Sequence, residues 1–381
     1  MKALVISHTY IARINRDKWK VFASRYSGMV VTVVFPKVWP THLFFHRAKI
    51  LAGENLPNCT FVALDVYNAG NEVKYSYNSQ ALIKLLIKTK PDIIHVEQGV
   101  HAFSYFQVIL FSYLLGLRPR FVFFTWVNWQ EKNALKHRFF TWLLEKINIS
   151  FTSGAVAGNN DAKDILHARG LKKDIIVLPQ LGVNQHIFTP AVKSSFSDTK
   201  KYIGYVGRIA EEKGVFLLVQ AYALLHEQFP DWNMRIVGDG PAKKQLIDFV
   251  VQHKLIDRIE FLDSVMHDVV AHVLHGIDIL VLPSYDTPNW KEQFGHILIE
   301  AMACKVPVIG SSAGEIAQVI ADSGLVFSQT DLCSLVQNLR SLMGDEFLRQ
   351  EFGQKGYERV QKKYSHEVIA DKTYAFWRSL I

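Results

Sequence analysis

The chain of 381 residues is long enough for two domains of ordinary size, and 49% hydrophobic and 20% charged residues exclude disorder along its whole length. The net charge of +8 is uneven, because residues 1–180 carry 23 Lys and Arg against 11 Asp and Glu, and residues 181–381 carry 20 against 24. The basic half suggests an anionic partner, such as a membrane surface, an acidic lipid-linked glycan or nucleic acid, and a lysine-rich solvated surface is the alternative.

From the N-terminus onward, short β-branched runs alternate with helical stretches, a pattern typical of right-handed βαβ units. In the first half we expect strands at 2–7, 29–35, 60–66, 92–97, 120–126, 149–158 and 175–179. In the second half we expect them at 202–207, 234–240, 258–262, 278–283, 306–311 and 324–328.

This order of elements predicts an α/β fold of two Rossmann-like, doubly wound domains that face a central cleft. We place the domains at 1–182 and 200–363, with a polar linker at 183–199. A C-terminal helix within 364–381 has an apolar face and is expected to pack back on the first domain.

Residues 98–117 contain no Asp, Glu, Lys or Arg and are long enough to span a bilayer. Polar side chains interrupt the segment and predicted strands flank it, so we expect a buried crossover helix instead. The apolar run that begins at Ala3 is too short for a signal-peptide core. Because the three cysteines are far apart, which fits a reducing compartment, we expect a cytoplasmic protein.

Polar and charged residues directly follow the first predicted strand of the second half, in "YVGRIAEEKG". Gly207 would form a tight turn, and Arg208 and Lys213 lie just beyond it. An Arg fork and a Lys charge near helix N-termini can hold a diphosphate. An ordinary surface loop is the alternative. The later "IVGDGP" is no dinucleotide fingerprint, because Lys243 stands where the third glycine is required.

The stretch "EQFGHILIEAMA" sets Glu292 and Glu300 on either side of Gly295. The glycine allows backbone N–H groups to approach an anion at the start of a helix. Glu300 lies about 8 Å further along the axis, where it would address a sugar attached to that anion. Two solvated glutamates beside a helix cap are the alternative. The chain has no Asp-x-Asp pair, the commonest sequence signal for a metal-held nucleotide sugar.

Five segments within residues 200–363 resemble, in order and spacing, the group-one family of retaining glycosyltransferases. They are "YVGRIAEEKGVFLLVQAYALL", "MRIVGDGPAKKQL", "RIEFLDSV", "DILVLPS" and "EQFGHILIEAMACKVPVIGSSAGEIAQVI". The resemblance implies the GT-B fold, a UDP- or GDP-sugar donor as substrate, and transfer with retention of anomeric configuration. It implies no further cofactor and no required metal ion.

The resemblance also implies roles for single residues. Arg208 and Lys213 would neutralise the donor diphosphate, Glu300 would bind the ribose, and Glu292 would orient and stabilise the sugar without acting as a covalent nucleophile. Further donor contacts would come from backbone and turn positions of the same motifs, namely Gly207, Phe294, Gly295, His296, Gly314 and Glu315.

The first half departs from the family pattern. The loop after its first strand has His8, Tyr10 and Arg13 but no glycine turn, and "TWVNW" stands where a histidine is often expected. Asn128 could still direct an acceptor group toward the sugar. We therefore take His8, Tyr10 and Asn128 as candidates for the acceptor side.

Two basic stretches with aromatic residues, 13–27 and 136–147, can form helices that lie on an anionic membrane, although ordinary Rossmann helices are the favoured alternative. We therefore expect sugar transfer to a glycan, lipid-linked or polysaccharide-precursor acceptor, with the protein peripheral on the inner membrane face. A non-catalytic nucleotide-sugar-binding protein and a sugar-nucleotide epimerase or hydrolase are the alternatives. Nucleic acid is not expected as a partner, because the basic half contains no recognition motif.

Overall fold

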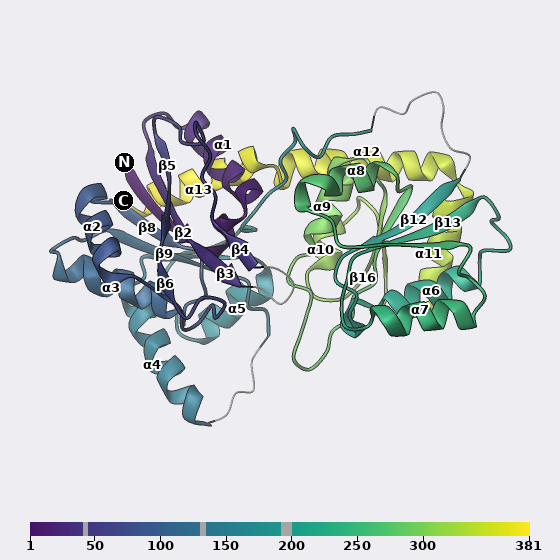
Figure 1. The fold of residues 1–381 in the computed structure, drawn as a ribbon, viewed down its shortest axis with the longest axis horizontal. Helices are drawn as coiled ribbons and strands as arrows, with labels where there is room; N and C mark the ends of the chain where they lie inside the picture. The colour runs from purple at the N-terminus through teal and green to yellow at the C-terminus, as the bar shows by residue number, and fades with distance from the viewer. Residues whose placement is uncertain (41–44, 130–134, 192–199) are drawn as a thin grey trace. The chain divides into compact units, whose positions relative to one another are not determined.

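The computed structural model describes residues 1–40, 45–129, 135–191 and 200–381, without the side chains of 45–46 and 135–140. The chain divides into two compact units, which Figure 1 shows. Unit 1 comprises Met1–Gly182 and His366–Ile381, and unit 2 comprises Val183–Ser365.

Unit 1 is built on a parallel sheet of seven strands in the order β11-β10-β9-β8-β1-β2-β5. The strands are β1 Lys2–Ile6, β2 Val30–Pro36, β5 Cys59–Leu64, β8 Ile93–Val96, β9 Arg120–Thr125, β10 Gly154–Ala157 and β11 Ile175–Val177. The α-helices are α1 Asp17–Arg25, α2 Ser79–Thr89, α3 Phe103–Leu114, α4 Leu135–Phe151, α5 Asn160–Ala168 and α13 His366–Leu380. Smaller elements are η1 His8–Ile11, η2 Arg13–Arg16 and the antiparallel pairs β3 Val38–Pro40 with β4 Phe45–Arg47 and β6 Val66–Tyr67 with β7 Ser76–Tyr77.

Unit 2 has a parallel sheet of six strands in the order β14-β13-β12-β15-β16-β17. The strands are β12 Lys201–Val206, β13 Trp232–Val237, β14 Ile259–Leu262, β15 Ile279–Leu282, β16 Val308–Ser311 and β17 Leu325–Phe327. The α-helices are α6 Val215–Ala223, α7 Lys243–Gln252, α8 Val270–His275, α9 His296–Ala303, α10 Ile316–Ile320, α11 Leu332–Gly344 and α12 Glu346–Lys363. The 3-10 turns η3 Glu211–Lys213 and η4 His267–Val269 lie in its loops.

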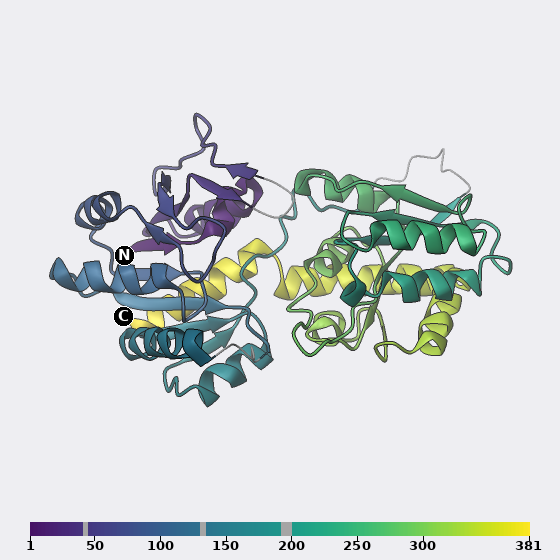
Figure 2. The same cartoon turned by 60° about the horizontal axis from the view of Figure 1, so that its bottom comes forward.

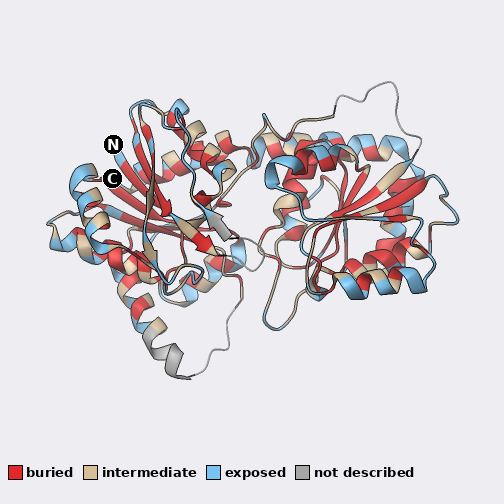
Figure 3. Cartoon of the chain, viewed as in Figure 1, coloured by how far each residue is buried: buried red, intermediate tan, exposed pale blue. Residues whose placement is uncertain are grey.

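Both sheets are covered by helices, and Figure 3 shows their strands as mostly buried. This explains the near-continuous runs of Val, Ile and Leu, because each strand is apolar on both faces. In each unit the strand order reverses beside the first strand, at β1/β8 and at β12/β15. Such switch points in open parallel sheets are where ligands bind, outside the carboxyl ends of the strands.

Helix α13 returns the end of the chain to unit 1, where Figures 1 and 2 show it beside α1. Trp377 stacks on Trp19 of α1 with ring centroids 5.6 Å apart, and both side chains are fully buried. On the surface of the same contact, Arg25 donates to the carboxylate of Asp371 from Nε (2.8 Å) and Nη2 (2.7 Å). The aromatic face noted in the sequence is thus buried in the core of unit 1.

Two predicted boundaries need correction. Residues 149–151 belong to α4, which runs to Phe151, and strand β10 begins only at Gly154. The predicted linker is ordered in its first part: Val183 pairs with Ser365, and Phe188 is buried within unit 2. Residues 192–199 lie outside the described residues.

The suggestion that residues 13–27 lie on a membrane is wrong for the side chains that would carry it. Arg16 is buried and donates to Glu54 Oε1 at 3.0 Å, and Lys18 is buried in an ion pair. Trp19 and Phe22 belong to the core. For the second stretch, 136–147, side chains before residue 141 lie outside the described residues. No helix in the described part of the chain is long and apolar enough to cross a bilayer, and α3 is a crossover helix as predicted.

Candidate active site

The predicted donor residues of unit 2 gather where β12, β15 and β16 end. Gly207 directly follows β12, Lys213 ends the turn η3, and Glu292 lies in the loop between β15 and α9. The lysine Nζ donates to Glu292 Oε2 at 2.6 Å, and Ser284 Oγ donates to the same oxygen at 3.0 Å. The Lys213 ammonium also lies 4.5 Å from the centre of the Trp290 ring. The sequence had assigned Lys213 and Glu292 separate tasks, whereas the structure joins them in one ion pair.

The second carboxylate of the motif has a different basic partner. Glu300 is buried in α9, and His267 Nε2 from the loop after β14 donates to its Oε1 at 2.7 Å. Burial pushes the pKa of His267 down, but the hydrogen bond and the charge of Glu300 outweigh it and leave that pKa above its ordinary value. Burial lowers the pKa of the neighbouring His296 to about 4, against the opposing charge of Glu300. Two histidines therefore flank Glu300: His267, whose protonated form the carboxylate stabilises, and His296, which stays neutral.

Two glycines shape this site through their backbone conformations. Gly314 has φ of +47°, and a Cβ there would lie 2.0 Å from the backbone oxygen of Glu292. The next residue, Glu315, donates its backbone N–H to that oxygen at 3.2 Å, so the turn after β16 supports the Glu292 loop. Gly295 has φ of +80° and precedes the first residue of α9, a conformation that side chains rarely tolerate. Both positions fit the motif's need for close backbone approach.

Arg208 and Phe294 contribute in different ways. The Arg208 side chain is exposed and, within the described residues, no hydrogen bond or ion pair holds its guanidinium, while its backbone oxygen accepts from the Tyr205 hydroxyl at 2.6 Å. Phe294 is buried and packs edge-on against Tyr364 at 5.6 Å, so only its backbone is available to a ligand. A surface hollow of about 390 Å³ lies at the nearby turn after β13 and the start of α7, lined by Asp239, Lys243 and their neighbours. No predicted donor residue lines it.

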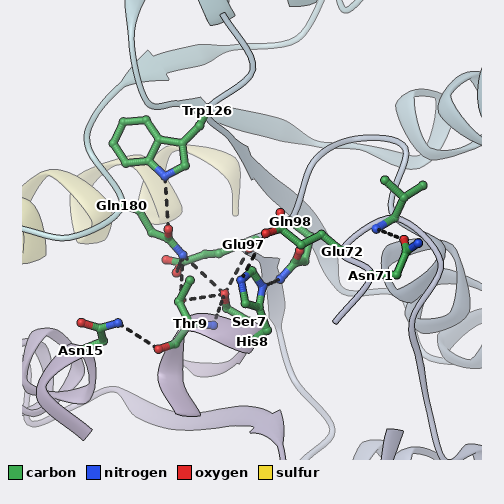
Figure 4. A network of polar contacts seen from close by, with 11 residues as sticks. Ser7, His8, Thr9, Asn15, Asn71, Glu72, Glu97, Gln98, Trp126 and Gln180 are labelled. Carbon is green, nitrogen blue, oxygen red and sulfur yellow. Dashed lines mark hydrogen bonds and ion pairs between the residues drawn. The ribbon is translucent and has the colours of Figure 1, made fainter. Parts of the chain in front are cut away.

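In unit 1, a polar network occupies the switch point between β1 and β8, as Figure 4 shows. Glu97, directly after β8, is fully buried and accepts from Lys18 Nζ at 2.7 Å and from Gln180 Nε2 at 3.0 Å. Lys18 also donates to the backbone oxygen of Gln180 at 2.7 Å. Burial pushes the pKa of Glu97 up, but the charges of Lys18 and His95 and the hydrogen bonds it accepts leave that pKa below its ordinary value.

One of the three acceptor-side candidates, Tyr10, belongs to this network. Tyr10 is fully buried and donates its hydroxyl to Glu97, so it is part of the scaffold and cannot touch an acceptor directly. Asn128 is also buried. His8 is better placed: it is partly exposed, stacks on Trp39 at 4.6 Å, and its Nδ1 is hydrogen-bonded to Gln98 Nε2 at 2.7 Å (Figure 4).

Sequence reasoning missed Glu97, Lys18, Gln180, Ser284 and His267. Glu97 could have been found, because it ends a predicted strand at a switch point, where polar side chains meet ligands. His267 had no signal, since its distance from Glu300 in the chain is set only by the fold. Within the described residues no cluster of His, Cys, Asp or Glu could hold a metal ion. The absence of a metal requirement stays a prediction.

Comparison with known proteins identifies the region that carries this site. Residues 189–359 match the profile of the family described as Glycosyl transferases group 1. N-acetyl-alpha-D-glucosaminyl L-malate synthase from Bacillus anthracis is 32% identical over 178 residues, which are 46% of this chain and 45% of the relative. The matches span about half the length of such curated relatives.

Solved structures match over the whole chain. Sucrose-phosphate synthase from Thermosynechococcus elongatus superposes with a TM-score of 0.73 at 20% identity, covering 100% of this chain and 99% of that chain. Alr3699/HepE from Anabaena, solved in complex with UDP, gives a TM-score of 0.72 at 15% identity with 100% of both chains covered. The predicted GT-B fold is thereby confirmed, and the predicted resemblance is confirmed over residues 189–359.

Proposed function

Because residues 189–359 match the Glycosyl transferases group 1 family, we propose that the protein transfers a sugar from a nucleotide-diphosphate sugar to an acceptor hydroxyl, with retention of anomeric configuration. The observation that carries the proposal is the pairing of both motif carboxylates with bases at one end of one sheet. Glu292 holds Lys213, and Glu300 holds His267.

The donor diphosphate would take the cationic end of the site. Arg208 has an exposed guanidinium that can donate two parallel hydrogen bonds to a phosphate, and Lys213 supplies a positive charge. The start of α9 adds a favourable field, because the N-terminal end of a helix dipole attracts an anion. The ribose would lie against Glu300, whose carboxylate can accept from two hydroxyls. UDP, bound in the Anabaena protein, is the first nucleotide to test.

The chemistry follows from where charge develops. As the bond between the anomeric carbon and the diphosphate oxygen breaks, its electron pair moves to the diphosphate, and Arg208 and Lys213 stabilise that charge. The acceptor oxygen attacks the same face of the sugar and passes its proton to the departing phosphate oxygen. Glu292 lies beside the cationic sugar and stabilises it electrostatically. No protein nucleophile is needed in this scheme.

Contacts to the acceptor would come from unit 1. His8 and Gln98 offer hydrogen-bonding groups at the switch point of that sheet, and the rigid Glu97 network behind them holds the loop in place. These neutral groups suit a sugar hydroxyl. We propose a glycan, a lipid-linked sugar or a polysaccharide precursor as the acceptor, used in the cytoplasm or at the inner membrane face.

The experiment that tests the donor site is calorimetric titration of UDP, GDP and ADP into the full chain, with EDTA and then with magnesium. We expect one nucleotide to bind without metal and Glu300→Ala to weaken it at least about tenfold, since a charged hydrogen-bond acceptor is lost. Glu227→Ala, an exposed glutamate of unit 2, is the matched control and should bind as the wild type does. Absence of binding by all three nucleotides in both conditions would overturn the donor assignment.

A second arm tests the role of Glu292. Glu292→Gln keeps the size of the side chain and removes its charge, so we expect nucleotide binding to persist while sugar transfer falls. Undiminished transfer by this variant would contradict electrostatic stabilisation by Glu292.

A further inference from the structure

Helix α3 buries polar side chains beside apolar ones and exposes an apolar stripe. Its polar side chains Ser104, Gln107 and Ser112 are buried against unit 1, and Gln107 bonds to both backbone groups of Tyr77. Its outward stripe, at the helical spacing of three and four residues, consists only of apolar and aromatic side chains: Phe103, Phe106, Leu110, Tyr113 and Leu114. Leu114 is 72% exposed and Leu110 40%.

Helix α4, described from residue 141 onward at the side-chain level, extends this apolar surface. Leu143 and Phe151 are exposed, and Phe151 lies on the side of α4 that meets α3. The rings of Tyr113 and Phe151 meet edge-on at 4.9 Å. We name Leu110, Tyr113, Leu114 and Phe151 the α3–α4 face.

Exposed basic residues outnumber exposed acidic ones around the α3–α4 face, although Glu72 and Asp92 of the same unit are exposed. The outward stripe of the neighbouring α2 carries Lys84 and Lys88, both exposed, and the segment after α3 carries Arg118 and Arg120. The guanidinium carbon of Arg118 lies over the Tyr113 ring, 4.3 Å from its centre. Between Ser79 and Arg120 the acidic residues are Asp92, which accepts from the backbone of Lys2, and the buried Glu97.

We propose that the α3–α4 face docks on an anionic lipid bilayer. Leu110 and Leu114 would enter the boundary between headgroups and acyl chains, Tyr113 would lie at the headgroup level, and the Lys and Arg side chains would reach the lipid phosphates. A protein partner is the less fitting occupant, because a rim in which exposed cations outnumber exposed acids suits a negative surface better than a mixed one. This inference is independent of the donor chemistry.

The same face accounts for two features of the sequence that the donor site leaves unexplained. Residues 98–117 lack charge although α3 is too short to cross a membrane, and the basic excess falls in residues 1–180. A helix that lies on a bilayer needs an apolar outer stripe and nearby cations, which are the two features observed here.

The test is cosedimentation of the full chain with vesicles of phosphatidylcholine alone or mixed with phosphatidylglycerol. We expect binding to the anionic vesicles at low salt, weaker binding at high salt and little to the neutral ones. Leu110→Ser combined with Leu114→Ser should lower the partition coefficient at least about tenfold. Arg118→Glu should lower it by about fivefold or more, since one cation near an anionic surface contributes about that factor.

The matched control is Leu224→Ser combined with Val251→Ser, which removes two similarly exposed apolar side chains from unit 2. It should sediment with vesicles as the wild type does, and all variants should keep nucleotide binding and the wild-type circular dichroism. Absent binding, equal binding to neutral vesicles, or an equal loss in the control would overturn the proposal. So would a dimer in solution that dissociates in the Leu110/Leu114 variant, because the face would then join two copies of this chain.

Discussion

Each unit places a lysine–glutamate pair at the carboxyl edge of its parallel sheet, yet the two pairs differ in their surroundings. Lys18 and Glu97 in unit 1 have side chains that are 3% and 0% exposed, whereas Lys213 and Glu292 in unit 2 are 19% and 11% exposed. Glu97 is saturated by Lys18, Tyr10 and Gln180. Water or a ligand can reach the second pair but not the first.

The difference shows why residue type at a strand end does not by itself identify a ligand site. A buried pair with every oxygen satisfied serves as an internal scaffold, because a charge without its partner there is very costly. A partly exposed pair can exchange its partner for a phosphate. In unit 1 the ion pair replaces the missing glycine turn as the device that fixes the loop after β1.

The largest effect is expected for Lys18→Ala. The substitution leaves the buried Glu97 carboxylate without its cationic partner. The free energy of unfolding of unit 1, measured by urea denaturation, should therefore fall by about 3–5 kcal/mol. Lys20→Ala on the same helix, whose pair with Asp17 is partly exposed, should cost about 1 kcal/mol or less. If both variants lost the same free energy of unfolding, the burial of the Lys18–Glu97 pair would not set it apart from a partly exposed pair.

The second-largest effect is expected on the activity of the partly exposed pair in unit 2. Lys213→Ala should leave the free energy of unfolding within about 1 kcal/mol of wild type, because water can replace the ammonium at Glu292. The same variant should lower kcat/KM for sugar transfer by about 10²–10³, since one preorganised cation facing the leaving group is lost. If Lys213→Ala unfolded readily but transferred sugar normally, Lys213 would have a structural role like that of Lys18.

The smallest effect concerns pH and the pair His267–Glu300. If a ribose hydroxyl takes over Glu300 Oε1, His267 loses the partner that raises its pKa, so nucleotide binding releases a proton. Affinity should then increase a few-fold as pH rises through the ordinary histidine range, about 6 to 8. The other charged or titratable groups facing His267 are Asp268 and His296, and His296 stays neutral there.

The matched variant is His267→Gln, which can still donate to Glu300 but does not titrate. Calorimetry across the same pH range should show a flat affinity in this variant. A pH dependence that survives in His267→Gln would assign the proton to another group.

The sequence by itself determined the strand order along the chain, the approximate domain limits and the donor motif. The run at β15, Ile279–Leu282, has no polar interruption, because a strand covered on both faces is apolar throughout. The motif from Glu292 to Gly314 was equally readable, since a glycine at φ above zero and a carboxylate beside it are local requirements.

Only the tertiary structure decided which of those residues meet. Lys213 and Glu292 are far apart in the chain, as are Lys18 and Gln180, and their pairing depends on which loops lie at the same edge of a sheet. Tyr10 illustrates the limit: its hydroxyl suggested an acceptor contact, and burial beside Glu97 made it part of the scaffold. Periodicity reports which face of an element is apolar, whereas partner choice and burial arise from contacts distant in sequence.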